Sequence, residues 1–190
     1  PRADTQVLLF AGDFIYRSDE ATPTLYPQGA ALPPQVKRWL DRSQAWAGRN
    51  QDIWTAGAVV KAPLAGMRVE AGLFYSLRDQ TSVYADILAG TRADGSVTSR
   101  RIVADGNNRD GSLSGEARLV KQWQTGSFSH QLTASVRGRK RDRRFGGSQT
   151  LPLGPSSALL PDPRPEPVHV IGPKSQDRVR QLTYGLAWSV

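Results

Sequence analysis

The sequence predicts an all-β protein, an antiparallel up-and-down sheet of about six strands. The first observation is alternation: between Gln131 and Arg137 every second residue is apolar, which gives this segment one apolar and one polar face. The second is recurrence, because comparable stretches follow one another along the 190 residues. The third is the connections, since long polar loops and tight turns alternate. A transmembrane β-barrel is built in this way, with tight turns on one rim and long loops on the other.

The six strands are expected near residues 6–17, 52–62, 67–78, 112–122, 128–141 and 178–190. Each has about 10–13 residues, the length that a tilted strand needs to cross a hydrocarbon core. No apolar run is long enough for a transmembrane helix. Residues 1–190 are therefore interpreted as one domain, a partial outer-membrane β-barrel with six transmembrane-type strands.

The first strand is predicted from apolar residues that share one face, namely Leu8, Phe10, Phe14 and Tyr16. Asp13 and Arg17 belong to its other face. The segment 18–51 contains four prolines, which cannot donate to a regular strand ladder. It is expected to be a long loop, with a short helix around 35–41.

The second and third strands form a predicted hairpin. Every second residue from 54 to 60 belongs to one face of the second strand. Residues 63–66 (PLAG) predict a tight turn, because proline presets φ and glycine tolerates a positive φ. In the third strand every second residue from 67 to 77 is apolar, and Phe74 is the exception on the polar face.

A second long loop is expected at 79–111, where Gly, Asp and Asn are frequent. Within it, residues 93–96 (ADGS) predict a hairpin turn between short strands at 84–91 and 97–104. We expect this hairpin to stand above a membrane.

The fourth, fifth and sixth strands repeat the pattern. Residues 124–127 (QTGS) predict the second tight turn, between the fourth strand and the fifth. The third long loop is expected at 143–177, and it contains the run PDPRPEP at 161–167. The sixth strand places four large apolar residues on one face: Leu182, Tyr184, Leu186 and Trp188.

Charges inside the strands lie opposite the apolar face, at Glu70, Glu116, Arg118 and Arg137. Such positions suit either bulk solvent or the wet or plugged lumen of a large barrel. Trp54 and Trp188 lie near strand ends, which suits either an aromatic girdle at a membrane interface or an ordinary core.

Composition narrows the classes of partner. The formal net charge is +8 and the sequence pI is about 10.3, which favours anionic partners such as nucleic acid, phosphorylated lipid or an acidic ligand. There is no cysteine, which excludes a disulfide framework and a thiolate metal site.

Several segments resemble the barrel of TonB-dependent outer-membrane receptors. The resemblance extends from about Ile53 to the end of the chain and is carried by residues 114–119 (SGEARL), 123–126 (WQTG), 130–132 (HQL), 137–147 (RGRKRDRRFGG) and 178–187 (RVRQLTYGLA).

The resemblance implies a 22-stranded barrel around an N-terminal plug. It also implies the uptake of a scarce nutrient, most often a ferric siderophore, with energy from the TonB complex of the inner membrane. The implied location is the outer membrane of a Gram-negative bacterium. The sequence departs from the family in having no plug, no TonB box and no terminal strand with an aromatic last residue. We therefore expect a fragment of the barrel, which would meet the TonB complex only through parts of the protein that are missing here.

A basic run from 137 to 144 has three interpretations. It can bind nucleic acid by releasing phosphate counterions, but no aromatic stacking platform is interleaved with it. It can be a merely solvated strand end. The favoured interpretation is contact with outer-membrane lipid and with the phosphates of lipopolysaccharide, through Arg139, Lys140, Arg141, Arg143 and Arg144.

The candidate ligand contacts are Trp39, Trp46, Arg100 and Arg101, in or near the long loops. Loop aromatics and arginines suit an aromatic or anionic siderophore, although loop packing and rim salt bridges are alternative roles. Asp105–Gly111 resembles a calcium loop but lacks the EF-hand spacing. The two histidines, His130 and His169, are far apart in the chain, so no metal site or cofactor is expected.

No catalytic constellation is present, and an enzyme is not expected. Two hypotheses remain. The favoured one is an incomplete wall of a TonB-dependent receptor, without nucleic acid as a partner. The alternative is a soluble, basic β-rich module that binds nucleic acid or another polyanion.

Overall fold

The computed structural model describes residues 4–21, 23–30, 32–37 and 42–190. These residues form an all-β structure, and none of them belongs to a helix that could span a membrane. The strands are β1 (Gln6–Ser18), β2 (Pro23–Pro27), β3 (Arg49–Leu64), β4 (Met67–Thr91), β5 (Ser96–Asp105), β6 (Asn108–Thr125), β7 (Phe128–Phe145), β8 (Gln149–Ser157) and β9 (Ser175–Ser189).

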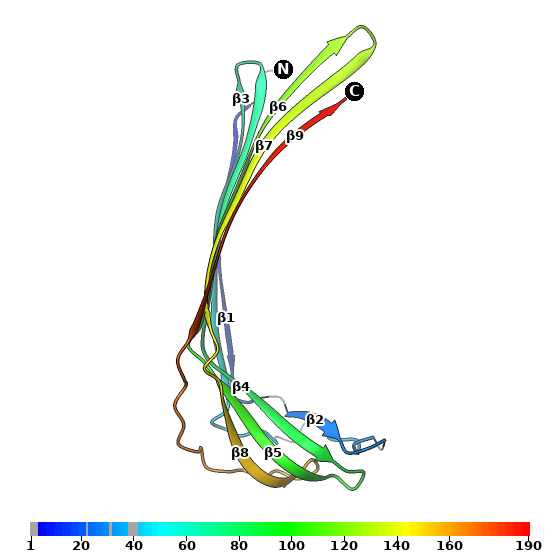
Figure 1. Cartoon of the computed structure of the whole chain (residues 1–190), viewed down its shortest axis with the longest axis vertical. Helices are drawn as coiled ribbons and strands as arrows, with labels where there is room; N and C mark the ends of the chain where they lie inside the picture. The colour runs from blue at the N-terminus through cyan, green and yellow to red at the C-terminus, as the bar shows by residue number, and fades with distance from the viewer. Residues whose placement is uncertain (1–3, 22, 31, 38–41) are drawn as a thin grey trace.

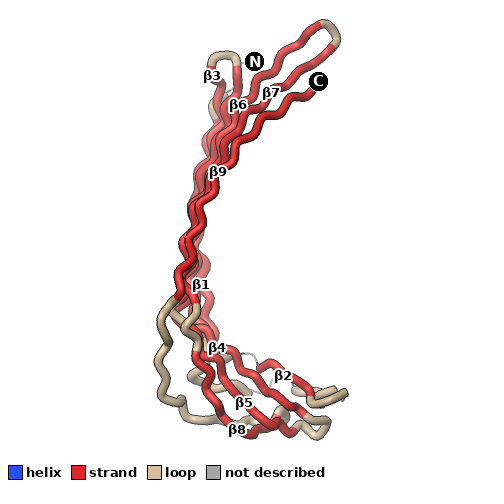
Figure 2. The backbone as a smooth tube through the Cα atoms, viewed as in Figure 1, coloured by secondary structure: helices blue, strands red, loops and turns tan. Residues whose placement is uncertain are grey.

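The main sheet has the order β1-β3-β4-β6-β7-β9, and all its neighbours are antiparallel. It is a long, curved single layer (Figures 1 and 2), and it is not closed into a barrel, because β1 and β9 are both edge strands. The prediction of a large antiparallel up-and-down sheet is confirmed. Both tight turns lie at the end of the sheet where the chain begins and ends, and the long connections lie at the other end.

The long connections contain more structure than the sequence predicted. β4 has 25 residues and continues to Thr91, through much of the segment expected to be loop. β2 and β8 lie within the other two predicted loops. Of the short helix predicted around 35–41, residues 38–41 lie outside the described part, and residues 35–37 are in neither helix nor strand.

The predicted hairpin above the main sheet is confirmed as the end of β4 and the start of β5. Its turn is closed by the Arg92 N–H, which donates to Ser96 O over 2.9 Å. Gly95 has a φ of 85°, and the Ser96 N–H donates to the Asp94 carboxylate over 2.9 Å. The short-range turn chemistry therefore decided this element, as the sequence indicated.

The end of β4, together with β2, β5, β8 and the loops around them, forms a second unit that we call the lobe (described residues within 19–48, 83–105 and 148–174). In it β2 is parallel to β4, and β5 is antiparallel to both β4 and β8. Two small clusters of buried apolar side chains lie there, one around Ile102, Ala104 and Leu151 and the other around Leu88 and Val97. The main sheet, as a single layer, has no comparable core among the described residues.

β4 changes its partner where the lobe begins. Its last register pair with β6 joins Gln80 to Asn108, and its first pair with β5 joins Val83 to Asp105. Gly106 fits the junction because a Cβ there would lie 2.5 Å from Thr81 O. The close approach of two backbones at this point requires glycine.

The register gives the main sheet two different faces. Because side chains alternate along a strand, each cross-strand row lies on one face. The central row of what we call the apolar face contains Val7, Val60, Ala71, Ala117, Val136 and Tyr184. The next row, on the polar face, contains Leu8, Val59, Gly72, Glu116, Arg137 and Thr183.

The first strand is an exception to this division. Its shared face of Leu8, Phe10, Phe14 and Tyr16 lies on the polar side of the sheet. There the rings of Phe10 and Phe74 are 5.9 Å apart, and they pack over Gly57, where no side chain separates them. Phe74, the exception in the third strand, thus has a partner that only the register of β1, β3 and β4 supplies.

Candidate functional site

The apolar face carries an uncharged band across all six strands of the main sheet. We call its three central rows the apolar band. They consist of Leu9, Ala58, Leu73, Gly115, Gly138 and Leu182; Val7, Val60, Ala71, Ala117, Val136 and Tyr184; and Ala62, Val69, Leu119, Ala134 and Leu186.

No second layer covers the band among the described residues (Figure 2). Leu182, Tyr184 and Leu186 are 61%, 73% and 76% exposed, and Leu9 is 72% exposed. An exposed apolar surface of this extent is unusual for a protein in water and is typical of an interaction or membrane surface. Two further rows flank the band. One begins at Ala11 in β1 and ends at Arg180 in β9, and the other contains Trp188, so the two rows are eight residues apart along β9. At about 3.3 Å per residue this is roughly 26 Å along a strand, or roughly 20 Å across a membrane for a strand tilted by about 40°.

Aromatic rings border the band at the end with the tight turns. The His130 ring lies between two indoles, with centroids 5.1 Å from Trp123 and 6.0 Å from Trp188. Trp54 and Tyr75 border the band toward the lobe. Stacked amphipathic rings at the limits of an apolar band match the girdles of membrane barrels.

Charged residues follow toward the lobe, on the same face. Arg17 forms an ion pair of 2.7 Å with Asp52, and Arg178 forms one of 2.9 Å with Asp142. The apolar face therefore changes from uncharged to strongly charged within a few residues along each strand.

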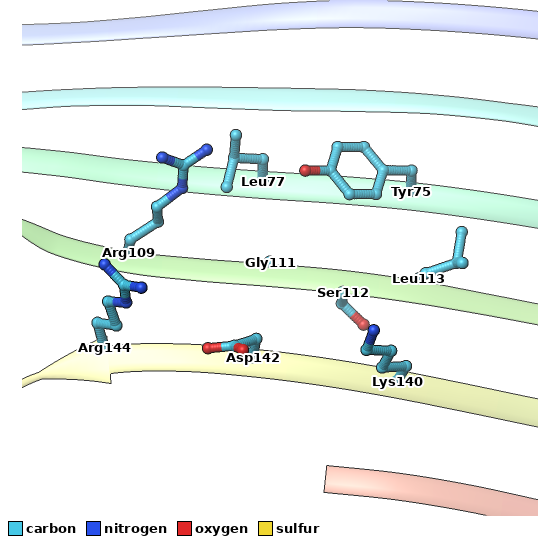
Figure 3. A pocket seen from close by; sticks show the side chains of 9 residues that line it. All are labelled: Tyr75, Leu77, Arg109, Gly111, Ser112, Leu113, Lys140, Asp142 and Arg144. Atoms are coloured by element: carbon cyan, nitrogen blue, oxygen red, sulfur yellow. The ribbon is translucent and has the colours of Figure 1, made fainter. Parts of the chain in front are cut away.

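A cavity of about 400 Å³ lies at this change, and Figure 3 shows its lining. Tyr75, Leu77 and Leu113 form its apolar side, and Arg109, Lys140, Asp142 and Arg144 its charged side. Cations placed directly beside apolar side chains can contact the phosphate and the acyl chain of one lipid molecule.

The alternation of β7 divides the basic run between the two faces. Lys140 and Arg144 lie on the apolar face, beside the cavity of Figure 3. Arg139, Arg141 and Arg143 lie on the polar face. Of the five residues predicted to contact lipopolysaccharide, the structure therefore brings two to the surface with the apolar band, and it adds Arg109 to them.

Ion pairs dominate the polar face. Arg141 donates two hydrogen bonds to Asp110, one of them 2.8 Å long, and Arg78 lies 3.5 Å from the same carboxylate. Arg118 pairs with Glu116. The Arg143 guanidinium lies 4.4 Å from the centroid of the Phe145 ring.

The candidate ligand contacts of the loops differ in their surroundings. Trp39 lies outside the described residues. Arg101 is exposed on β5. Trp46 is half-buried; its indole N–H donates to Arg164 O over 2.9 Å, and its ring meets Tyr84 edge-on at 5.8 Å.

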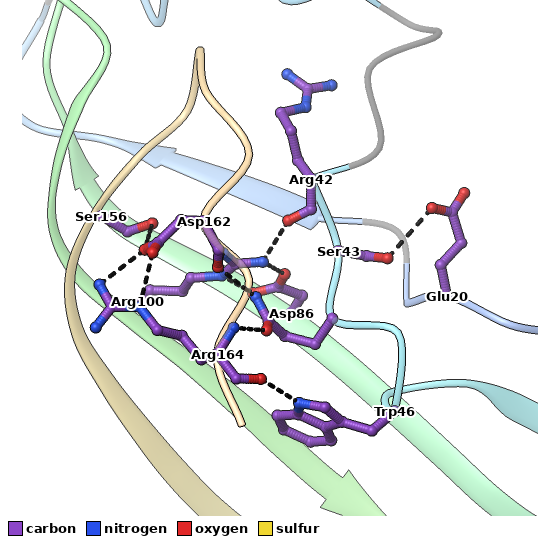
Figure 4. Close-up of polar contacts among 10 residues, drawn as sticks. Glu20, Arg42, Ser43, Trp46, Asp86, Arg100, Ser156, Asp162 and Arg164 are labelled. Atoms are coloured by element: carbon purple, nitrogen blue, oxygen red, sulfur yellow. Dashed lines mark hydrogen bonds and ion pairs between the residues drawn. The ribbon is translucent and has the colours of Figure 1, made fainter. Parts of the chain in front are cut away.

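Arg100 is the buried centre of the lobe (Figure 4) and not a surface residue. Its side chain is 1% exposed and pairs with Asp86, which is fully buried. The Arg100 guanidinium also donates to the carbonyl oxygens of Arg42 and Asp162. Charged hydrogen bonds to both loops hold them against β5, so Arg100 has a structural role in this geometry.

No family model matches the chain, and neither a curated protein nor a solved structure matches it.

Gln44 and Asp162 extend the hydrogen-bond network around Arg100, and no pattern in the sequence indicated them. The Gln44 amide donates to Asp162 O and accepts from the Arg164 N–H, at 2.9 and 2.6 Å. These residues are more than a hundred positions apart, so only the folded lobe brings them together. Burial in the lobe raises the pKa of the Tyr84 phenol, and the nearby Glu166 carboxylate raises it further.

The segment Asp105–Gly111, which resembles a calcium loop in sequence, binds the ammonium group of Lys174. Lys174 Nζ lies 3.1 Å from Asn108 Oδ1 and 3.5 Å from Asp105 Oδ1, and it also donates to Gly146 O. Among the described residues no group of three His, Cys, Asp or Glu side chains could hold a metal ion. The turn thus links the start of β6 to the segment before β9.

We expect acid to weaken the lobe through Asp162. A hydrogen bond from Arg164 lowers the pKa of Asp162, and the Ser156 hydroxyl and the charges of Arg164 and Arg100 act in the same direction. A carboxyl whose pKa is lower in the folded state stabilises that state fully above the unfolded pKa of about 3.9. This contribution is lost as the pH falls below that value and through the folded pKa.

Asp162→Asn removes this titration, so its unfolding midpoint in urea should fall less steeply below about pH 4 than that of the unchanged chain. Fluorescence measured from pH 7 to pH 2.5 reports the midpoint, in chains with and without Asp162→Asn that retain Trp46 as their single tryptophan. Equal slopes for the two proteins would show that Asp162 does not couple folding to protonation.

Proposed function

We propose that this chain is part of the barrel wall of a TonB-dependent outer-membrane receptor, which takes up a scarce nutrient such as a ferric siderophore. The observation that carries the membrane location is the exposed apolar band, bordered by aromatic rings and then by charges, on one face of strands long enough to span. The opposite, polar face suits a wet lumen. The lobe then lies outside the membrane, on the side of the long loops.

The receptor family is supported by the resemblance of the last three long strands to the barrels of these receptors. In this proposal the strands are scaffold and lining, and the exposed parts of the lobe, including Arg101 and Trp46, meet the ligand. Contact with the TonB complex belongs to other parts of such a receptor. The role is binding and transport and not catalysis.

Lipopolysaccharide is the proposed lipid partner. In this proposal Lys140, Arg144 and Arg109 meet its phosphates, because they lie at the charged limit of the apolar band. Arg139, Arg141 and Arg143 point to the other face and are less suited to it. The soluble alternative, a module for nucleic acid or another polyanion, would need a partner to cover the apolar band.

Quenching of tryptophan fluorescence by a brominated alkyl detergent tests the membrane location. Two variants each retain a single tryptophan, either Trp188 beside the band or Trp46 in the lobe, with phenylalanine at the other positions. We expect strong quenching of Trp188 and weak quenching of Trp46, and precipitation of both variants without detergent. A chain that stays soluble without detergent, with equal weak quenching of both residues, would refute the proposal.

A further inference from the structure

Strand β7 presents a row of arginines on the polar face. Arg137, Arg139, Arg141 and Arg143 occupy every second position, so their side chains share one face. Neighbouring members of such a row are about 6–7 Å apart along the strand. Four like charges at this spacing need counter-charges nearby.

Only part of the row is neutralised within the sheet. Asp110 pairs with Arg141. Glu116 lies opposite Arg137 in the register and interacts with its charge, but the ion pair of Glu116 is with Arg118. Within the described part of the chain, no carboxylate forms an ion pair with Arg137 or Arg139, and Arg139 donates only to the Ser112 hydroxyl, over 3.3 Å.

A cavity of about 620 Å³ lies against these two arginines. Its lining includes Ser114, Arg137, Arg139, Arg180, Gln181 and Thr183. Ser114, Gln181 and Thr183 belong to the rows of Arg139 and Arg137, on the polar face. Arg180 also lines it, but its register pair with Lys140 places Arg180 on the apolar face, so Arg137 and Arg139 are the arginines of the cavity on the polar face. No carboxylate belongs to the described residues that line the cavity.

We propose that this cavity binds a small polyvalent oxyanion, one that carries several carboxylate or phosphate groups. A guanidinium group presents paired donors that match the two oxygens of such a group, and hydroxyl and amide donors complete its shell. Two neighbouring arginines favour a ligand with more than one anionic group. The inference rests on the proposed function. If the polar face lines the lumen of a receptor, a site for oxyanions there means that the substrate carries anionic groups, such as its chelating groups.

Isothermal titration of the chain in a neutral alkyl glucoside detergent tests the site, with citrate and inorganic pyrophosphate as the two probes. We expect one saturable site for at least one probe, with an affinity that falls at least tenfold in Arg137→Gln/Arg139→Gln. The matched control, Lys61→Gln/Lys121→Gln, loses the same charge at exposed positions that do not line the cavity and should bind within twofold of the unchanged chain. An equal loss of affinity in both double variants would show that binding depends only on net charge, and it would overturn the proposal.

A second variant, Arg137→Lys/Arg139→Lys, distinguishes lost recognition from a folding defect, because it keeps the charges and removes the paired donors. We expect it to keep the β-sheet circular dichroism spectrum and to bind more weakly than the unchanged chain. Unchanged affinity in this variant would contradict guanidinium recognition. Absence of binding to both probes, with binding to a polyglutamate peptide, would show that the row meets an acidic segment and would also overturn the proposal.

Quenching by brominated detergent, measured on the variant that retains Trp188 as its single tryptophan, separates this outcome from failure of the membrane location. A quenched Trp188 without oxyanion binding rejects the substrate class alone. Oxyanion binding without quenching rejects the membrane wall alone.

Discussion

Asp86→Ala is expected to destabilise the lobe by about 3–5 kcal/mol, the largest effect of any single substitution proposed for this chain. Asp86 is fully buried, and its carboxylate is the counter-charge of Arg100, which is 1% exposed. Without Asp86 the guanidinium keeps its positive charge in a site that solvent does not reach. Its remaining acceptors are the carbonyl oxygens of Arg42 and Asp162, which cannot balance that charge.

Unfolding in guanidinium chloride measures this loss, followed by the fluorescence of a chain that retains Trp46 as its single tryptophan, because Trp46 contacts the lobe through Tyr84 and Arg164. Arg101→Ala on the same strand is the control, and it should change the free energy of unfolding by no more than about 0.5 kcal/mol, since Arg101 is exposed. Asp86→Leu/Arg100→Met should recover most of the stability, because it removes both buried charges. A loss below about 1 kcal/mol in Asp86→Ala would show that the pair is solvated in solution.

Leu186→Arg is expected to destabilise the main sheet in detergent by roughly 2–4 kcal/mol, the cost of arginine in the middle of a hydrocarbon layer. Leu186 lies in the apolar band, one row from its centre, and is 76% exposed. In water such an exposed site on an edge strand would accept arginine at almost no cost. The expected loss therefore depends on detergent chains lying against the band.

Ala187→Arg is the matched control, because Ala187 is the next residue of β9, is exposed and belongs to the polar face. Its free energy of unfolding should stay within about 0.5 kcal/mol of the unchanged chain. Urea unfolding of both variants in the same micelles, followed by circular dichroism, gives the comparison. Equal small losses in the two variants would place both faces in water and would favour the soluble alternative.

Local chemistry predicted much of the main sheet. Alternation between Gln131 and Arg137 and the PLAG and QTGS turns set strands and reversals that depend only on neighbouring residues. The ADGS turn likewise predicted the hairpin of β4 and β5. Alternation could also have indicated that Arg100 is buried. Arg100 shares one face of its strand with the buried Ile102 and Ala104, whereas Arg101 lies on the other face.

The lobe could not be predicted in this way, because its contacts join residues that are far apart in the sequence. Gln44 meets Asp162 and Arg164, and β8 pairs with β5 across the whole of β6 and β7. Prolines indicated a loop at 18–51 and 143–177, but Pro23 and Pro27 form the ends of β2, and Pro152 and Pro155 lie within β8. They carried no information on which segments would pack together.

The sequence by itself determined the strands of the main sheet, their turns and which side chains share a face, because the two-residue period of a strand is a local property. Only the tertiary structure decided which faces of neighbouring strands coincide, since register is set by pairing between distant segments. Register placed the aromatic face of β1 on the polar side, aligned the apolar band across six strands and put Arg137 and Arg139 beside a cavity without a carboxylate among its described lining residues. It also turned Arg100 from a candidate surface contact into the buried partner of Asp86.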